Sequence, residues 1–154
     1  MSTTELRSIG SLISGRRAAA NTAVTAGGGG DNAAVTGVTI DRAALGYPDS
    51  AVFIVTYSAT LAQGATLSIA HTVQGSEAAN MASPATIDSR GATVVATGPV
   101  GGGTVTGEVE IDVSLRGAGR YVRLNFTPDL SAANTDTAAL AAVAVFGGAS
   151  RLPQ

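Results

Sequence analysis

Two stretches in the second half of the chain alternate between apolar and polar side chains. In residues 108–115, and again in residues 120–126, the apolar side chains fall on every second position. Successive side chains of a β-strand point to opposite faces, so this period of two predicts strands with one buried and one solvent-facing side. The short Gly117-Ala118-Gly119 link between the two stretches predicts that they pair as a β-hairpin.

Further strands follow from other patterns along the chain. Residues 51–57 are apolar on both faces, which is typical of a central strand or of a strand between subunits, and residues 66–73 alternate after a Gln-Gly turn. Residues 35–41 and 92–97 give weaker strand signals. The alanine-rich stretch 138–146 fits a strand or a helix, and its valines and the glycines that follow favour a strand.

Turn signals separate these strands. They are rich in Gly, Pro and Asp and lie at residues 46–49, 98–99, 101–103 and 127–129. About six to eight short strands with such turns predict an all-β fold, an antiparallel β-sandwich or jelly roll, in a single domain. Helix is expected only as a turn near residues 76–81.

The first 30 residues are polar, small and glycine-rich, and we expect them to form an extended N-terminal arm. Four apolar residues within them have spacings that place them on one side of a short helix: Leu6, Ile9, Leu12 and Ile13. The four glycines at 27–30 predict a flexible hinge. The expected organisation is an arm and hinge at 1–30, a β-sandwich domain at 31–147 and a C-terminal tail at 148–154.

The arm has the character of a docking segment. Arginine suits pairing with carboxylates across interfaces, and two arginines lie beside the apolar residues of the arm. The predicted partner-binding residues are Leu6, Ile9, Leu12, Ile13, Arg16 and Arg17. Deleting residues 1–20 should then leave the sandwich folded.

The amino-acid composition limits which classes of protein and partner are expected. Apolar residues make up 45% of the chain but aromatic residues only 4%, so the core consists largely of small side chains, and a modestly stable domain gains from association. The net charge of −2, with nine arginines and no lysine, forms no basic stripe, so nucleic acid is not an expected partner. No apolar run is long enough for a secretory signal or a membrane span, which predicts a soluble protein with no membrane partner.

Side chains for catalysis are scarce. Without cysteine or lysine, the chain cannot use thiolate or Schiff-base chemistry or complete a phosphate-binding P-loop. The only histidine, His71, falls on an apolar strand face, where a hydrogen-bonded packing role is favoured over that of a general base. Glu108, Glu110 and Asp112 line one strand face; a cation site or a glycosidase pair would use such a set, but a solvated face explains it as well. We expect no enzyme activity, no cofactor, no metal and no small-molecule substrate.

Several stretches resemble small virion proteins encoded in the structural gene clusters of tailed phages. They share a pattern of strands and turns, which runs through residues 30–32, 37–42, 50–52, 59–61, 120–130 and 135–148. The resemblance is to capsid decoration proteins, also called cement proteins. It implies a β-sandwich or jelly roll, made in the host cytoplasm, that forms a homotrimer on the outer surface of the capsid. There it would stabilise the lattice by bridging subunits of the major capsid protein.

Two other functions stay open. A head–tail adaptor, tail or fibre component of the virion would use a similar sandwich. A host- or carbohydrate-binding module displayed on the virion is the second alternative. Carbohydrate sites generally need aromatic platforms, and three Tyr, three Phe and no Trp disfavour that alternative.

Overall fold

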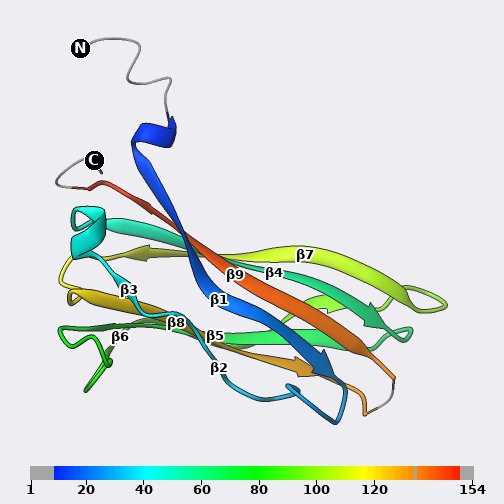
Figure 1. Cartoon of the computed structure of the whole chain (residues 1–154). Helices are drawn as coiled ribbons and strands as arrows, with labels where there is room; N and C mark the ends of the chain where they lie inside the picture. Colours follow the sequence, from blue (N-terminus) through cyan, green and yellow to red (C-terminus); the bar gives the residue numbers. More distant parts are fainter. Residues whose placement is uncertain (1–8, 134, 150–154) are drawn as a thin grey trace.

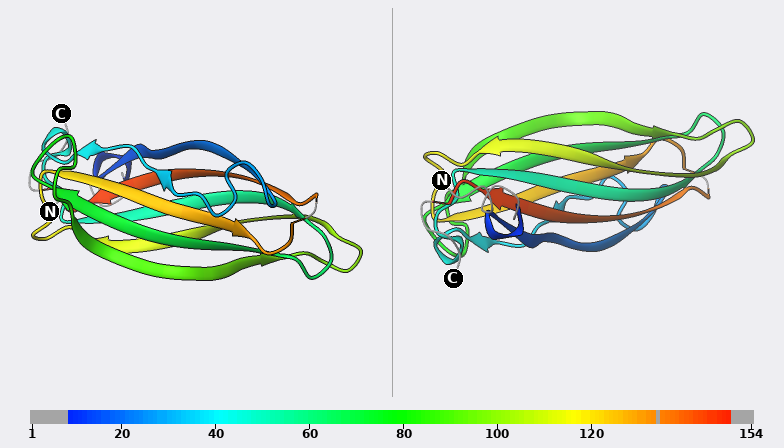
Figure 2. Two further views of the ribbon diagram at one scale, coloured as in Figure 1. Left: turned by 90° about the horizontal axis from the view of Figure 1, so that it is seen from below. Right: turned by 90° about the horizontal axis from the view of Figure 1, so that it is seen from above.

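The computed structural model, shown in Figure 1, describes residues 9–133 and 135–149 as two antiparallel β-sheets packed face to face. Sheet A has the strand order β1 (Ile13–Thr25), β9 (Thr137–Gly147), β4 (Ser50–Leu61) and β7 (Gly103–Ser114). Sheet B contains β8 (Tyr121–Leu130), β5 (Thr66–Ser76) and β6 (Ala85–Thr97), and two short strands, β2 (Val35–Thr36) and β3 (Ile40–Asp41), both pair with β8. Two single 3₁₀ turns, η2 (Ile9–Ser11) and η3 (Ala43–Leu45), precede β1 and β4. Figure 2 shows the two layers from opposite sides.

The connections between strands follow the jelly-roll order. Because β2 and β3 pair with the same strand one after the other, they are two parts of one interrupted strand. The chain then changes sheet at every connection except the β5–β6 turn, which joins neighbours within sheet B. Two four-stranded sheets wound in this way form a jelly roll. The predicted all-β fold is therefore confirmed, and the connectivity selects the jelly roll.

Most of the predicted strands are present, with longer bounds than the sequence indicated. The doubly apolar stretch 51–57 lies in β4, which is a central strand of sheet A, and the ambiguous stretch 138–146 lies in β9. The stretch predicted from 35 to 41 is interrupted, because β2 ends at Thr36 and β3 begins at Ile40. Residue 76 ends β5, residues 77–80 form a bend and a turn, and no helix is present between residues 76 and 81.

The predicted hairpin between residues 108–115 and 120–126 is wrong. Strand β7 pairs with β4 along its whole length, whereas β8 pairs with β5, so the Gly117-Ala118-Gly119 link crosses from sheet A to sheet B. A link of this length fits either a hairpin or an arch between sheets, and only the long-range strand pairing distinguishes the two.

The turn predicted at residues 127–129 is also wrong, because Pro128 lies inside β8 opposite Ile69. The carbonyl of Pro128 accepts a hydrogen bond from the backbone N–H of Asn32. Asn32 precedes β2, so at this point β8 has no strand as a neighbour on that side. The nitrogen of Pro128 points to the same side as its carbonyl. Its lack of an N–H therefore costs no hydrogen bond between strands.

The predicted arm is wrong for residues 13–25, because they form β1 at the edge of sheet A. Strand β1 pairs with β9 from Ile13 to Thr25, with irregularities near residues 18 and 20, and it buries Ala18, Ala19 and Val24. The glycine run that follows is a defined turn rather than a flexible hinge. Its Gly28 donates a hydrogen bond to the carbonyl of Thr25, and the amide of Gly27 donates to the carboxylate of Asp31. Deletion of residues 1–20 would therefore remove part of this edge strand, including its buried Ala18 and Ala19, so the expectation that the sandwich stays intact without them is not supported.

The core lies between the two sheets and is filled by alternate residues of each strand. Three phenylalanines supply its largest side chains: Phe53, Phe126 and Phe146. The rings of Phe53 and Phe146 meet edge to face with their centroids 6.1 Å apart, which is a favoured aromatic geometry. Much of the rest is alanine, valine and leucine, so each inward position adds only modest apolar area.

Candidate binding surface

The outer faces of the two sheets differ sharply in polarity. On sheet B the central strands β5 and β8 turn mostly polar side chains outward, namely Ser68, Thr72, Gln74, Arg123, Asn125, Thr127 and Asp129. Such residues are compatible with water, as expected of the exposed face of an antiparallel sheet. On sheet A, β9 turns alanines and valines outward from residue 139 to residue 145, and β4 turns Val52 and Ile54 outward beside them. The other outward residues of β4 are polar, namely Ser50, Thr56, Ser58 and Thr60. Sheet A is therefore the layer with an outer surface suited to another protein.

The outer surface of sheet A contains an apolar band formed by Val52 and Ile54 of β4 with Val143 and Val145 of β9. In the register of the sheet, Val52 lies opposite Val145 and Ile54 lies opposite Val143. Residues directly opposite each other on neighbouring strands project to the same face, so the four side chains are contiguous. Val143 is 44% exposed and the other three are partly exposed. Alanines 139 and 141 continue the band along β9.

The apolar band is flanked by opposite charges. Arg17 of β1 lies opposite Val143, and Glu110 of β7 lies opposite Ile54. One row across the outer face therefore reads Arg17, Val143, Ile54, Glu110, with the cation at one edge and the carboxylate at the other. Within the described part of the chain, neither Arg17 nor Glu110 forms an ion pair.

The acidic edge is longer than this one row. Glu108, Glu110 and Asp112 are all exposed and alternate with inward-facing residues of β7, as predicted. Arg90 of β6 and Asp112 line the same small cleft at the side of the sandwich, but no ion pair joins them. The carboxylates of β7 are thus available to a cation on another molecule.

A shallow depression of about 740 Å³ lies at one end of this face, where β1, β4, β7 and β9 meet. Its lining includes Ile13, Val52 and Val145, together with Asp112 and Arg116 near its rim. It is open and mostly apolar. The depression therefore continues the apolar band rather than enclosing a small molecule.

The predicted partner-binding residues are spread over this edge of the molecule. Leu6 lies outside the described residues. Ile9, Leu12 and Ile13 are 69%, 41% and 37% exposed, but they do not share a helix face, because η2 ends at Ser11 and β1 begins at Ile13. Arg16 and Arg17 are both exposed and occupy successive positions of β1, so they point to opposite faces and only Arg17 borders the apolar band.

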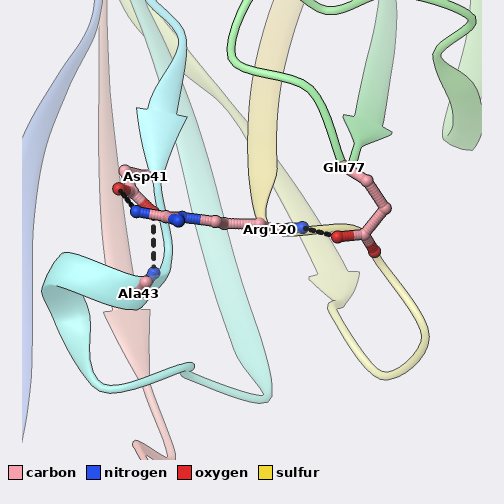
Figure 3. Close-up of polar contacts among 4 residues, drawn as sticks. All are labelled: Asp41, Ala43, Glu77 and Arg120. Carbon is pink, nitrogen blue, oxygen red and sulfur yellow. Dashed lines mark hydrogen bonds and ion pairs between the residues drawn. The ribbon is translucent and has the colours of Figure 1, made fainter.

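The loops at the end of the molecule that carries η3 are joined by Arg120. Its Nε and Nη2 donate to the two carboxylate oxygens of Asp41 at 3.0 and 2.8 Å, and its backbone N–H donates to Glu77 at 3.4 Å (Figure 3). Asp41 also accepts a hydrogen bond from the amide of Ala43. The hydrogen bonds from Arg120 lower the pKa of Asp41, and the same pairing raises the pKa of Arg120. Both groups are thus held in their charged forms, in a bidentate pair that fastens loops together.

A second arginine, Arg42, is buried beneath these loops and was not singled out in the sequence. Its Nη1 donates to the carbonyls of Ala118 and Gly119, and its Nη2 donates to the carbonyl of Pro48 at 2.8 Å. Burial lowers the pKa of Arg42. The residue holds the link between β7 and β8 in its crossing path, and no pattern of neighbouring residues could have predicted that.

The one histidine of the chain is paired with an aspartate, and both line a small open cleft. His71 faces the core, as predicted, and its Nε2 lies 2.9 Å from Oδ2 of Asp88. No group of three or more His, Asp or Glu side chains among residues 9–133 and 135–149 is arranged to hold a metal ion. Over the same residues, no helix is long and apolar enough to cross a membrane.

Comparison with known proteins gives a likeness of fold alone. No protein-family model matches the chain, and no curated protein matches it. A chain in the structure of the Gt strain of infectious bursal disease virus is 15% identical with a TM-score of 0.50, and the match covers 92% of this chain and 34% of the viral one. The Gx strain gives 13% identity and a TM-score of 0.49 over the same shares. A xylan-binding domain of Paenibacillus barcinonensis Xyn10C gives 10% identity and a TM-score of 0.34, over 89% of this chain and 87% of that one.

This protein shares its fold with a viral chain. It spans about a third of the length of the viral chains that it matches.

Proposed function

We propose that this protein is a structural component of a virion that binds the outside of a phage head and bridges subunits of the major capsid protein. The observation that carries the proposal is the exposed apolar segment before β1, where Ile9 is 69% and Leu12 41% exposed. Exposed apolar side chains of this kind mark a contact with another protein, and the apolar band of sheet A is a second such surface. The resemblance in sequence to decoration proteins, and the fold shared with a chain of a viral structure, both support a role in a shell.

The chemistry of the described residues supports the same conclusion. The one histidine, His71, is paired with Asp88, and Arg120 is paired with Asp41 through two hydrogen bonds. The proposed role needs only side chains that form contacts with other proteins.

Contact with the capsid is assigned to the residues just before β1. Ile9 and Leu12 are exposed apolar side chains on a segment that extends beyond the end of the sandwich (Figure 1). Burying such side chains against another protein is favourable by about 25 cal/mol for each Å² removed from water. Each contact is small, but many copies on one lattice would add their contacts through avidity.

The test is co-sedimentation with heads of the phage that encodes the chain, prepared without this protein. The double variant Ile9→Ser with Leu12→Ser should reduce the amount bound, since it removes apolar contacts without touching a strand. The matched control is Val100→Ser. Val100 is 89% exposed in the β6–β7 loop, at the opposite end of the molecule from η2 (Figure 1). That variant should bind as the wild type does.

Two outcomes contradict the proposal in different ways. If the wild-type protein does not sediment with heads, the role on the capsid is wrong. If the wild type binds and only Val100→Ser releases it, the capsid contact lies at the other end of the sandwich. Electron microscopy of labelled virions separates a lattice position from the alternative, a place in the tail or the head–tail adaptor.

A further inference from the structure

The outer face of sheet A is complementary to itself. Its central row runs from Arg17 through Val143 and Ile54 to Glu110, so charge changes sign from one edge of the sheet to the other. We propose that two copies of the chain pack face to face through this surface, about a two-fold axis parallel to the strands. The proposal concerns free protein in solution and does not depend on a role in a virion.

The register of the sheet determines which two-fold axis is favourable. An axis parallel to the strands, between β9 and β4, lays β1 of one copy over β7 of the other and keeps each row at the same level. Arg17 then meets Glu110 of the second copy, and Val143 meets Ile54 of the second copy. An axis in the same plane but perpendicular to the strands would instead lay Arg17 over Arg17. Electrostatic complementarity therefore selects the first arrangement.

The apolar band is also complementary to itself under the same rotation. Val145 of one copy faces Val52 of the other, because these two residues also share a row. Aligned sheets pack about 10 Å apart with their strands within about 30° of each other. Rows near the centre of the face therefore stay in contact with the matching rows of the second copy, whereas rows at the ends move apart from theirs. The row containing Arg17 and Glu110 lies near the middle of β4, where the match is retained.

The whole outer face of sheet A is about as large as a standard protein interface, and the apolar band occupies part of it. Four strands about 4.8 Å apart, and 12 residues of β4 at about 3.3 Å each, give a face of roughly 760 Å². A standard interface between proteins buries about 800 Å² on each partner. The outer face of sheet B has a similar extent but is polar, and the same rotation there brings no apolar band together.

The experiment uses two charge reversals, Arg17→Glu and Glu110→Arg, in the full chain. Both residues are exposed and neither has an ion pair among the described residues, so each variant should fold, as checked by circular dichroism and thermal unfolding. Sedimentation equilibrium of each purified variant should show the dimer weakened by at least about tenfold, because each homodimer then contains two like-charge contacts. The matched control, Asp129→Arg on the outer face of sheet B, should dimerise as the wild type does.

Mixing the two variants provides the decisive measurement. In a two-fold pair of one Arg17→Glu chain and one Glu110→Arg chain, both contacts again join opposite charges. Native mass spectrometry of an equimolar mixture should therefore show the heterodimer as the main species, although each variant alone is largely monomeric. In a three-membered ring at least one contact must join two copies of the same variant, so the mixture could not regain full assembly.

Three results would overturn the proposal. The first is a wild-type protein that is monomeric at high micromolar concentration. The second is a wild-type trimer, the state expected from the sequence resemblance. The third is failure of the mixed variants to form a heterodimer when the control variant dimerises. Co-sedimentation of Arg17→Glu with phage heads is measured separately, so that loss of the dimer and loss of capsid binding are distinguished.

Discussion

Replacing Arg42 with methionine tests whether one buried guanidinium holds the crossing between the two sheets. Methionine keeps most of the apolar volume of the side chain and removes its three hydrogen bonds, to the carbonyls of Ala118, Gly119 and Pro48. Arg42 is only 5% exposed, so little water reaches the carbonyl oxygens in its place. The substitution should leave the strands intact and destabilise the folded state.

The expected magnitude follows from the bonds that are lost. A hydrogen bond with a charged partner contributes roughly 1.5–3 kcal/mol, so three of them amount to at least about 4.5 kcal/mol. Part of this is offset, because the variant no longer has to remove a cation from water. We expect a net loss of about 3 kcal/mol in the free energy of unfolding. With a urea m-value of about 2 kcal/mol/M, the midpoint would fall by about 1.5 M.

Equilibrium unfolding in urea, followed by circular dichroism, measures this loss. The matched control is Arg116→Met, two residues before Ala118. The Arg116 side chain is 82% exposed and lies 3.9 Å from the nearest carboxylate oxygen of Asp49, and pairs of this kind contribute about 0–1 kcal/mol. Arg42→Lys should be intermediate, since a compact ammonium cannot span the carbonyls on both sides. If Arg42→Met unfolds within about 1 kcal/mol of the wild type, the guanidinium does not hold the crossing and the reasoning fails.

Two further predictions concern backbone packing and pH. Gly98→Ala should lower the free energy of unfolding by more than about 2 kcal/mol, because its Cβ would clash with the carbonyl oxygen of Ala62, whereas Gly91→Ala, at an open position, should change it by less than about 0.5 kcal/mol. The urea midpoints of the wild type and the two glycine variants, measured in one series, give both changes. The pairing with Arg120 lowers the pKa of Asp41 below its ordinary value of 3.8, so its contribution is complete above pH 3.8 and is lost as the pH falls through the folded-state pKa. The wild type should therefore be more stable than Asp41→Asn at pH 7, and a difference that persists unchanged at pH 2 would contradict this assignment.

The positions of most strands follow from the local pattern of apolar and polar residues. A period of two in apolar side chains depends only on the alternation of a strand, so residues 66–73 and 108–115 could be identified without knowing their partners. The inward position of His71 and the exposed row of carboxylates on β7 follow from the same alternation. The doubly apolar stretch 51–57 already indicated a central strand, and it carries half of the apolar band.

Strand pairing was not determined locally. Which strand lies beside β7 depends on contacts between residues far apart in the sequence, and a short glycine-containing link fits a hairpin and a crossing equally well. The small and polar residues of β1 have weak strand propensity and by themselves indicate an arm, but pairing with β9 supplies the hydrogen bonds that make them a strand. Propensity is a weak signal wherever tertiary contacts decide the outcome.

The same distinction between local pattern and strand pairing applies to the candidate binding surface. The dominance of strands, the scarcity of catalytic side chains and the row of carboxylates at 108–112 could all be recognised from the amino-acid sequence. The placement of Arg17 and Glu110 in one row across an apolar band could not, since they lie 93 residues apart and are brought together by strand pairing. Alternation fixes the face of a strand on which a side chain lies, whereas register and strand order fix its neighbours on that face.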